Sequence, residues 1–86
     1  PHTITHLQFV RPSDFPRFAK LGTVAAMQLL WAAAGPETVD LVQPYVDPGA
    51  YRWQYPARSL HEAGAVVAGA SDWFVSSPDP FAAMYQ

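Results

Sequence analysis

The sequence predicts an α/β protein in which about three parallel strands alternate with helices. Three segments have strand character, namely residues 3–10, 23–28 and 65–70, and segments with helical character separate them. The last of these strands is a continuous apolar run, which is typical of a parallel strand that is buried on both faces. The first 28 residues predict a strand–helix–strand unit with short linkers, and such units form parallel sheets.

The first strand and the first helix have recognisable boundaries. Residues 3–10 are rich in β-branched and aromatic side chains, and Pro12 ends the strand because proline lacks the N–H group that a sheet requires. Ser13 is the expected N-cap of the helix that follows, and Gly22 is its expected stop. One face of this helix would carry the apolar residues Phe15, Phe18 and Leu21.

The middle of the chain, residues 29–54, is a long and mostly irregular connection. It contains three prolines, and we expect only one short helix in it, beginning at Gly35-Pro36 and extending through Val39 and Val42. Long connections in compact domains are commonly functional loops. Aromatic side chains in or beside this segment would either line a pocket for an apolar substrate group or simply pack the loop; these are Trp31, Tyr45, Tyr51, Trp53 and Tyr55.

Two further helices are expected in the second half of the chain. Pro56 suits a first helical position, and the helix would run to Glu62 with Gly64 as its stop. The other helix begins at Asp79-Pro80 and continues to the last residue. The strand at residues 65–70 lies between these two helices, as the alternating pattern requires.

The composition excludes some classes of protein and favours others. Charged residues make up 14% of the chain and hydrophobic residues 50%, which is too apolar for a small domain with a large surface. We therefore expect either an oligomer that associates through exposed apolar faces or a part of a larger polypeptide, whose remainder would be its partner. A net charge of −2 offers no basic surface for nucleic acid. The apolar stretches are too short to cross a membrane, no signal peptide is visible, and the absence of cysteine fits a reducing, cytoplasmic compartment.

Polar residues stand at or near the ends of all three expected strands. They are His6, Gln28 and Asp72, and active sites of parallel α/β folds gather at the carboxyl ends of strands. His6 is a candidate metal ligand, or else a histidine that is satisfied by a backbone carbonyl; His2 is too far along the strand to share an ion with it. Asp72 follows an apolar run, so it must be paired, bind a metal or face a wet cleft, unless it caps a turn. His61, within an expected helix, is interpreted as a surface residue.

Three longer stretches of the sequence are similar to one enzyme family. The strings HTITHLQFVRPSDFPRFAKLG, AAMQLLWA and RWQYPARSLHEAGAVVAGASDWFVSSPDPF together resemble the YtcJ-like branch of the metal-dependent amidohydrolases, also called amidohydrolase family 3. The resemblance extends over essentially the whole chain. It implies that residues 1–86 are part of a (β/α)₈ TIM barrel, roughly its sixth to eighth strands, and that the barrel is incomplete without the rest of a parent polypeptide.

The resemblance also assigns roles to individual residues. His6 corresponds to a metal-binding histidine, and Asp72 to an aspartate that binds the metal and acts as the catalytic base. Gln28 and Trp31 correspond to positions near the substrate. The sequence departs from the family pattern at several positions close to these residues, namely Thr5, Leu29, Ala70 and Phe74.

The resemblance implies that the parent protein is a metal-dependent hydrolase. A divalent metal, zinc by its preference for imidazole and carboxylate ligands, would activate water for cleavage of a non-peptide C–N bond in a small-molecule amide. The family's other metal ligands have no counterpart in these residues, so the 86-residue chain by itself is expected to be inactive. The alternative is a non-catalytic binding or regulatory module derived from an amidohydrolase barrel.

Overall fold

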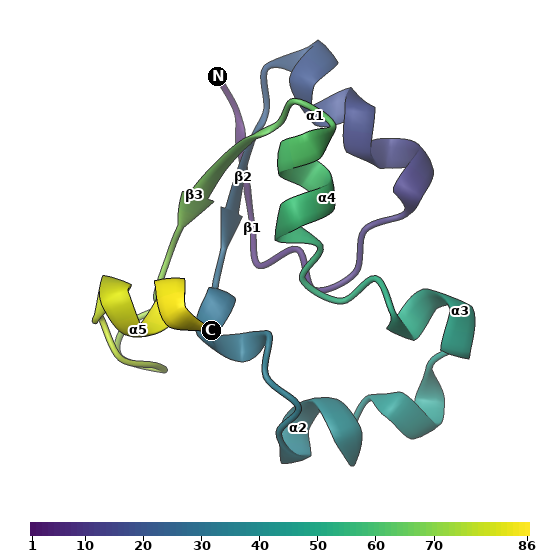
Figure 1. Ribbon diagram of the computed structural model, residues 1–86, viewed down its shortest axis with the longest axis vertical. Coiled ribbons are helices and arrows are strands. Elements are labelled where there is room, and N and C mark those ends of the chain that lie inside the picture. Colours follow the sequence, from purple (N-terminus) through teal and green to yellow (C-terminus); the bar gives the residue numbers. More distant parts are fainter.

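A small parallel sheet organises the molecule. The computed structural model describes all residues 1–86 and contains three strands, β1 (Thr3–Thr5), β2 (Val24–Met27) and β3 (Val66–Gly69). They form one sheet in the order β1-β2-β3, and both pairs of neighbours run parallel (Figure 1). The predicted α/β class with three parallel strands and intervening helices is therefore confirmed.

Two helices pack together beside the sheet and bury its only core. Helices α1 (Phe15–Leu21) and α4 (Ala57–Glu62) lie on the same side of the sheet (Figure 1). Ala25 and Met27 of β2 are completely buried beneath them, because alternate residues of a strand point to the same face. The core cluster consists of Val10, Phe15, Phe18, Ala25, Met27, Leu60 and Ala65.

Residues 29–54, which we call the arm, extend away from the end of β2 and return to the start of α4 (Figure 1). The arm is less irregular than expected, since it contains four short helical turns, namely η2 (Leu29–Trp31), α2 (Pro36–Val39), η3 (Gln43–Tyr45) and α3 (Pro48–Tyr51). Its base is closed by an antiparallel bridge between Phe9 and Gln54 and by a 2.9 Å hydrogen bond from the Tyr55 N–H to the Gln8 carbonyl. The last helix, α5 (Pro80–Tyr85), lies at the same end of the sheet as the arm, but on the other side of the sheet.

The first strand is much shorter than the sequence predicts. The backbone leaves the extended region at His6 and Leu7, which both have positive φ, 68° and 57°, so β1 ends at Thr5 and not at residue 10. Ser13 is not an N-cap either, because it lies inside a 3-10 turn, η1 (Pro12–Asp14), and Asp14 occupies the N-cap position of α1.

The other helix boundaries agree with the sequence to within a few residues. Gly22 ends α1 in the left-handed conformation at φ 64°, as predicted. The Asp79 side chain accepts hydrogen bonds from two N–H groups of the first turn of α5, so this N-terminus is also confirmed. Pro56 is the N-cap of α4 and not its first residue, and α2 ends at Val39, before the predicted Val42.

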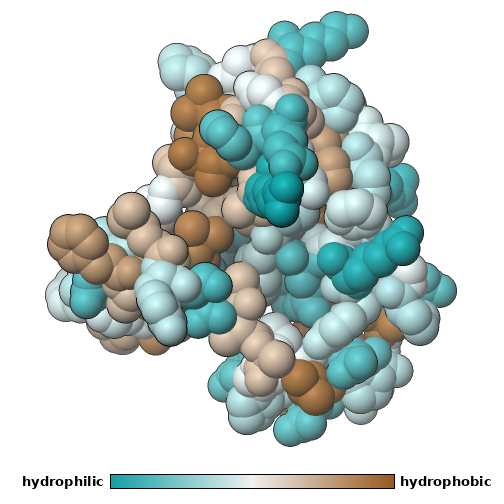
Figure 2. Space-filling view, viewed as in Figure 1, coloured by the Kyte–Doolittle hydropathy of each residue, from teal (hydrophilic) through white to brown (hydrophobic).

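Much of the apolar surface is not covered. Only 10 of the 86 residues are buried, and the accessible surface is 6020 Å², whereas a folded chain of this mass exposes about 5,000 Å². All residues of β1 are exposed, and Val66 of β3 is 65% exposed, so the prediction that the third strand is buried on both faces is wrong within this chain. Figure 2 shows hydrophobic residues at the surface along the side where β3 and α5 lie. None of the helices has the length and apolar character needed to cross a bilayer.

Candidate functional site

The three strands end at a common edge of the sheet, and the predicted site residues lie there. The register pairs Thr5 with Ala26 and Ala26 with Ala68, so the next residues of all three strands emerge at about the same level. Because the strands are parallel, this edge collects their carboxyl ends. His6 follows β1 directly, Gln28 follows β2 directly, and Asp72 lies three residues beyond β3.

His6 is held in an unusual backbone conformation. Its φ of 68° is followed by a φ of 57° at Leu7, and the Leu7 N–H donates to the Thr5 carbonyl at 3.0 Å. The exposed imidazole stacks on the indole of Trp31, with ring centroids 5.2 Å apart and planes inclined by 21°. The stacking is its only specific side-chain contact, so neither ring nitrogen is engaged by the backbone and both are available to a ligand.

Gln28 links the ends of β1 and β2 through its side chain. It is only 3% exposed, and its Nε2 donates to the Thr5 hydroxyl at 3.2 Å. Its Oε1 is buried and accepts no hydrogen bond. An unpaired buried acceptor costs about 1–3 kcal/mol, so this amide oxygen is a polar group in need of a donor at the edge where the strands end.

Asp72 begins a turn, but its side chain does not cap it. The backbone φ is 52°, and the Asp72 carbonyl accepts from the Val75 N–H at 2.7 Å. The Ser71 hydroxyl, not the Asp72 carboxylate, accepts from the Trp73 N–H at 3.2 Å, and it is the Ser71 carbonyl that accepts from the Ser76 hydroxyl. The exposed carboxylate is thus free of hydrogen bonds and ion pairs within the chain.

His6 and Asp72 share the edge of the sheet without being neighbours. They follow the two outer strands, with β2 between them, so their strands are not adjacent. Two interstrand spacings separate those strands by about 10 Å. Nowhere does the chain gather three or more His, Asp or Glu side chains in a group that could hold a metal ion. The residues of this chain therefore do not fit a complete metal centre.

A cavity lies between this edge and the arm. We call it the arm cavity; its volume is about 650 Å³, and 7 of its 12 lining residues are hydrophobic. That volume is within the usual range for a small-molecule pocket. Its walls include Gln8 beyond β1, Trp31 beyond β2, and Val75 and Ser76 beyond Asp72, so residues next to each strand end contribute. Arm residues including Glu37 and Leu41 complete the walls.

Tyr55 contributes a phenol to the wall of the arm cavity. Burial raises the pKa of the Tyr55 phenol above its usual value near 10, because the phenolate would lose solvation. The phenol therefore stays protonated at neutral pH and can donate a hydrogen bond. Among the other aromatic residues, Trp31 lines the cavity, as expected for a substrate pocket, and Trp53 packs against the core, as expected for a packing residue. Tyr45 does neither, since it is 84% exposed.

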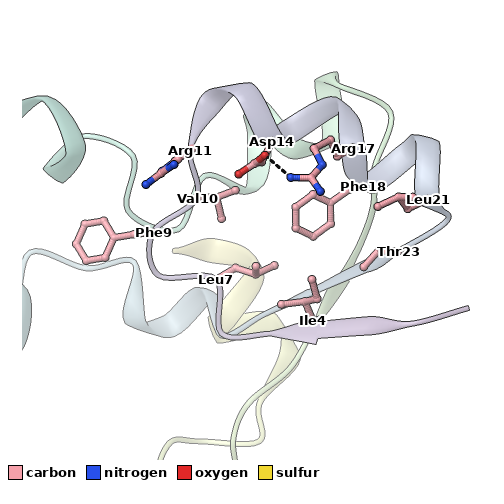
Figure 3. Close-up of a pocket in the computed structure, with 10 residues that line it drawn as sticks. All are labelled: Ile4, Leu7, Phe9, Val10, Arg11, Asp14, Arg17, Phe18, Leu21 and Thr23. Atoms are coloured by element: carbon pink, nitrogen blue, oxygen red, sulfur yellow. Dashed lines mark hydrogen bonds and ion pairs between the residues drawn. The ribbon is translucent and has the colours of Figure 1, made fainter.

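A second depression, a groove of about 440 Å³, runs between β1 and α1 and has a different character. Figure 3 shows its lining side chains, among them Ile4, Leu7 and Phe18, together with the ion pair between Arg17 and Asp14 at 2.8 Å. This groove contains none of the predicted site residues. The groove is apolar surface beside the edge strand β1 that no other element covers. The polar side chains that could take part in a reaction lie elsewhere, at the strand ends.

Two residues of the site could not be singled out from the sequence. Glu37 and Tyr55 are both in the cavity wall, although one belongs to the arm and the other follows it. Glu37 follows Gly35-Pro36 at the start of a short helix, which is a common place for a carboxylate; the residue is exposed, and only the fold shows that it also borders the cavity. In the sequence, Tyr55 is only one of several aromatic residues around the arm, and its position depends on the pairing of residues 8–9 with residues 54–55.

An open parallel sheet with helices beside it defines the class as an α/β protein, and polar groups and a cavity lie at the carboxyl edge, where ligands of such folds commonly bind. The family model described as "Amidohydrolase family" matches residues 1–86, that is, the entire sequence. The chain therefore belongs to the amidohydrolase family, and a hydrolase-type function is indicated. Comparisons with curated proteins and with solved structures gave no match.

Proposed function

We propose that the chain forms part of a metal-dependent hydrolase that cleaves non-peptide C–N bonds in small amides. The proposal rests on the position, the backbone conformation and the unpaired side chains of His6 and Asp72. Both follow strands that end at one edge of the sheet, both have a positive φ, and both present side chains without a hydrogen-bond partner in the chain. Membership of the amidohydrolase family supports the same function.

Backbone strain at these two positions supports a functional interpretation. A non-glycine residue in the left-handed region costs on the order of 1 kcal/mol, and such residues cluster at sites where a side chain must be aimed. His and Asp tolerate this region better than most residues, but Leu7 does not share that advantage. A chain under no functional constraint would relieve the strain with glycine at exposed positions such as 6 and 72.

The chemistry of the two side chains suits hydrolysis. A carboxylate at Asp72 can accept a proton from water as the water attacks an amide-type carbonyl, and can return that proton to the departing nitrogen. Gln28 and Trp31 would contact the substrate: Trp31 is part of the cavity wall, and the Gln28 Oε1, although buried within this chain, has no other hydrogen-bond partner. In the proposal, His6 and Asp72 supply two ligands for a divalent metal, zinc by donor type.

The remaining ligands would come from polypeptide outside residues 1–86. Three parallel strands with two open edges fit a segment of a (β/α)₈ barrel, and the large uncovered apolar surface fits burial against the rest of such a barrel. The same reasoning makes the 86-residue chain inactive by itself, since two ligands do not hold a catalytic metal. The partner in this proposal is the remainder of the polypeptide, and the substrate is a small-molecule amide.

Metal analysis of the complete polypeptide tests the proposal. The unaltered protein should contain about one equivalent or more of bound metal and hydrolyse simple N-acyl amines. His6→Gln and Asp72→Asn should each lower the metal content and reduce hydrolysis by at least 100-fold. The matched controls His61→Gln and Asp40→Asn change the same residue types at exposed positions outside the strand ends, and should leave both measurements unchanged.

Unchanged metal content and turnover in both His6→Gln and Asp72→Asn would refute the proposal. A protein that binds small amides but neither holds metal nor hydrolyses them would instead identify the non-catalytic binding module. The two readings therefore lead to different measured results.

A further inference from the structure

We infer that the arm cavity selects substrates that carry a positive charge on an apolar frame, and that the Glu37 carboxylate is the group that selects them. This inference rests on the proposed hydrolase function and names the class of substrate for the same site. It is derived from three features of the cavity: its apolar wall, the position of its only charged side chain, and the charge of the segment that encloses it.

The wall of the arm cavity suits a compact apolar frame. Leu30, Trp31, Leu41, Val42 and Val75 contribute apolar surface, and the volume of about 650 Å³ accommodates a substituted benzene ring with an amide. Trp31 offers a broad aromatic face, and its contact with the His6 imidazole connects the cavity with the end of β1. A molecule that occupies the cavity therefore contacts the indole on which His6 stacks, although His6 and Asp72 themselves are not part of the cavity lining.

Glu37 is the only charged residue in the lining of this cavity. An unpaired carboxylate in a largely apolar wall attracts an ammonium group or a strong hydrogen-bond donor and repels a carboxylate. No basic side chain of the chain forms an ion pair with Glu37, since the two salt bridges join Arg17 with Asp14 and Arg58 with Glu62. Its charge is thus available to a ligand.

Hydrogen bonds fix the backbone turn that carries Glu37. Gly35 and Glu37 both line the cavity, and a Cβ at position 35 would lie 3.2 Å from the Glu37 Oε2. The carboxylate therefore extends over the space that glycine leaves free. Thr38 fixes this turn, because its hydroxyl accepts from the Gly35 N–H at 3.2 Å and donates to the Ala33 carbonyl at 2.8 Å. The Tyr51 hydroxyl donates to the Thr38 carbonyl at 3.2 Å and ties α2 to α3.

The net charge of the arm also favours a positively charged ligand. The arm carries three carboxylates, Glu37, Asp40 and Asp47, against a single basic residue, Arg52. The Arg52 guanidinium lies 5.3 Å from the centroid of the Trp53 ring and lines a smaller neighbouring cavity of about 210 Å³, not the arm cavity itself. The excess of carboxylates in the arm favours the approach of a cation over that of an anion.

The test compares amides that differ only in charge, using the complete polypeptide. The ammonium substrate is N-[4-(aminomethyl)benzyl]acetamide, its neutral isostere is N-(4-ethylbenzyl)acetamide, and its anionic counterpart is N-[4-(carboxymethyl)benzyl]acetamide. We expect kcat/KM to be about tenfold higher for the ammonium substrate than for the neutral one, and lowest for the anionic one. Added salt should reduce the preference.

Two variants distinguish the role of Glu37 from a general effect of charge. Glu37→Gln should remove the preference for the ammonium substrate, so that kcat/KM for the ammonium and the neutral substrate becomes equal within about twofold. Gly35→Ala keeps the charge but displaces the carboxylate, and it should weaken the preference too; the backbone at Gly35, with φ −98°, accepts alanine. Asp40→Asn removes one carboxylate from the same segment outside the cavity lining and should preserve most of the preference.

Binding of unreactive probes separates this inference from the proposed hydrolysis. Benzylammonium should perturb the NMR signals of the Trp31 indole at concentrations about tenfold lower than benzyl alcohol does, and Glu37→Gln should abolish this difference. Selective binding without hydrolysis would support the cavity's selectivity and refute the proposed activity. Hydrolysis that is indifferent to charge, or a charge preference that survives in Glu37→Gln, would overturn the inference and leave the proposed activity standing.

Discussion

Replacing Asp72 with glycine should make the protein more stable and less active at the same time. The backbone at Asp72 has a φ of 52°, where the Cβ of an L-residue is crowded and glycine is not. The carboxylate is exposed and makes no hydrogen bond or ion pair within the chain, so its removal forfeits no stabilising contact. Relief of the left-handed strain is worth about 1–2 kcal/mol and the entropic cost of glycine is about 0.5–1 kcal/mol, so we expect Asp72→Gly to raise the free energy of unfolding by a net amount of about 0.5–1 kcal/mol.

The measurement is chemical denaturation of the complete polypeptide, with hydrolysis recorded in parallel. Asp72→Ala serves as a control because alanine retains the Cβ, and it should be less stable than Asp72→Gly by about 1 kcal/mol. Asp40→Gly is a second control, since Asp40 is exposed too but has a φ of −88°. There, glycine should lower the stability by about 0.5–1 kcal/mol through the entropy of the unfolded chain.

Opposite signs for glycine at positions 72 and 40 would support the reasoning. If Asp72→Gly destabilised the protein as much as Asp40→Gly, the backbone at residue 72 would not be strained. If Asp72→Gly stabilised the protein and also retained full hydrolysis, the strain would have no connection with the catalytic role proposed for Asp72. Either result would remove the observation on which the proposed function depends.

Three further measurements examine other parts of the molecule. Leu60→Ala should cost about 2–5 kcal/mol of stability by denaturation, because Leu60 is fully buried, whereas Leu41→Ala, at a residue 69% exposed, should change it by less than about 0.5 kcal/mol. The raised pKa of Tyr55 means that the folded state holds the phenolic proton more tightly than the unfolded state does. The free energy of unfolding should therefore be independent of Tyr55 ionisation below pH 10 and should fall as the pH rises above it. Tyr55→Phe should abolish this fall in stability, whereas Tyr45→Phe, at an exposed residue, should not. The 86-residue chain alone should associate in sedimentation experiments through surfaces such as the one around Val66, and a monomer at all concentrations would contradict this.

Local signals in the sequence predicted the parts of the fold that local chemistry controls. Gly22 ends its helix because only glycine enters the left-handed region without strain, and Asp79 caps α5 because its carboxylate reaches two free N–H groups. The parallel sheet was also predictable, since short apolar segments alternated with helical ones. In each case the cause and the effect lie within a few residues of each other.

The features that were missed depend on contacts between distant segments. Residues 6–10 have strand-like composition, but the Phe9–Gln54 bridge and the Tyr55–Gln8 hydrogen bond bind this segment to the base of the arm and bend it at His6 and Leu7. Composition alone cannot indicate that contacts with the arm outweigh the strand preference of this segment. The exposure of Val66 has a similar origin, because an apolar strand is buried only when another element covers it, and no element of this chain does so.

The positions of the candidate residues in the fold could be predicted from the sequence, but their neighbours could not. The sequence placed His6, Gln28 and Asp72 at strand ends, and parallel topology then brings them to one edge. It could not indicate that Trp31 stacks on His6, or that Glu37 enters the same cavity, because both contacts depend on how the arm folds back. The order of the strands also separates His6 from Asp72 by a whole strand, which sequence spacing does not reveal.

The buried amide of Gln28 connects the stability of the sheet with the incompleteness of the site. Its Nε2 is satisfied by Thr5, but its Oε1 is sealed from solvent without a donor, at the edge where the three strands end. Leucine would fill the same space without this cost, so an amide is expected only where a donor from a substrate or from further polypeptide completes it. Under the proposed function, the strained backbone at His6 and Asp72 and the unpaired acceptor at Gln28 would follow from one condition, namely that the edge of this sheet binds groups from the substrate or from further polypeptide.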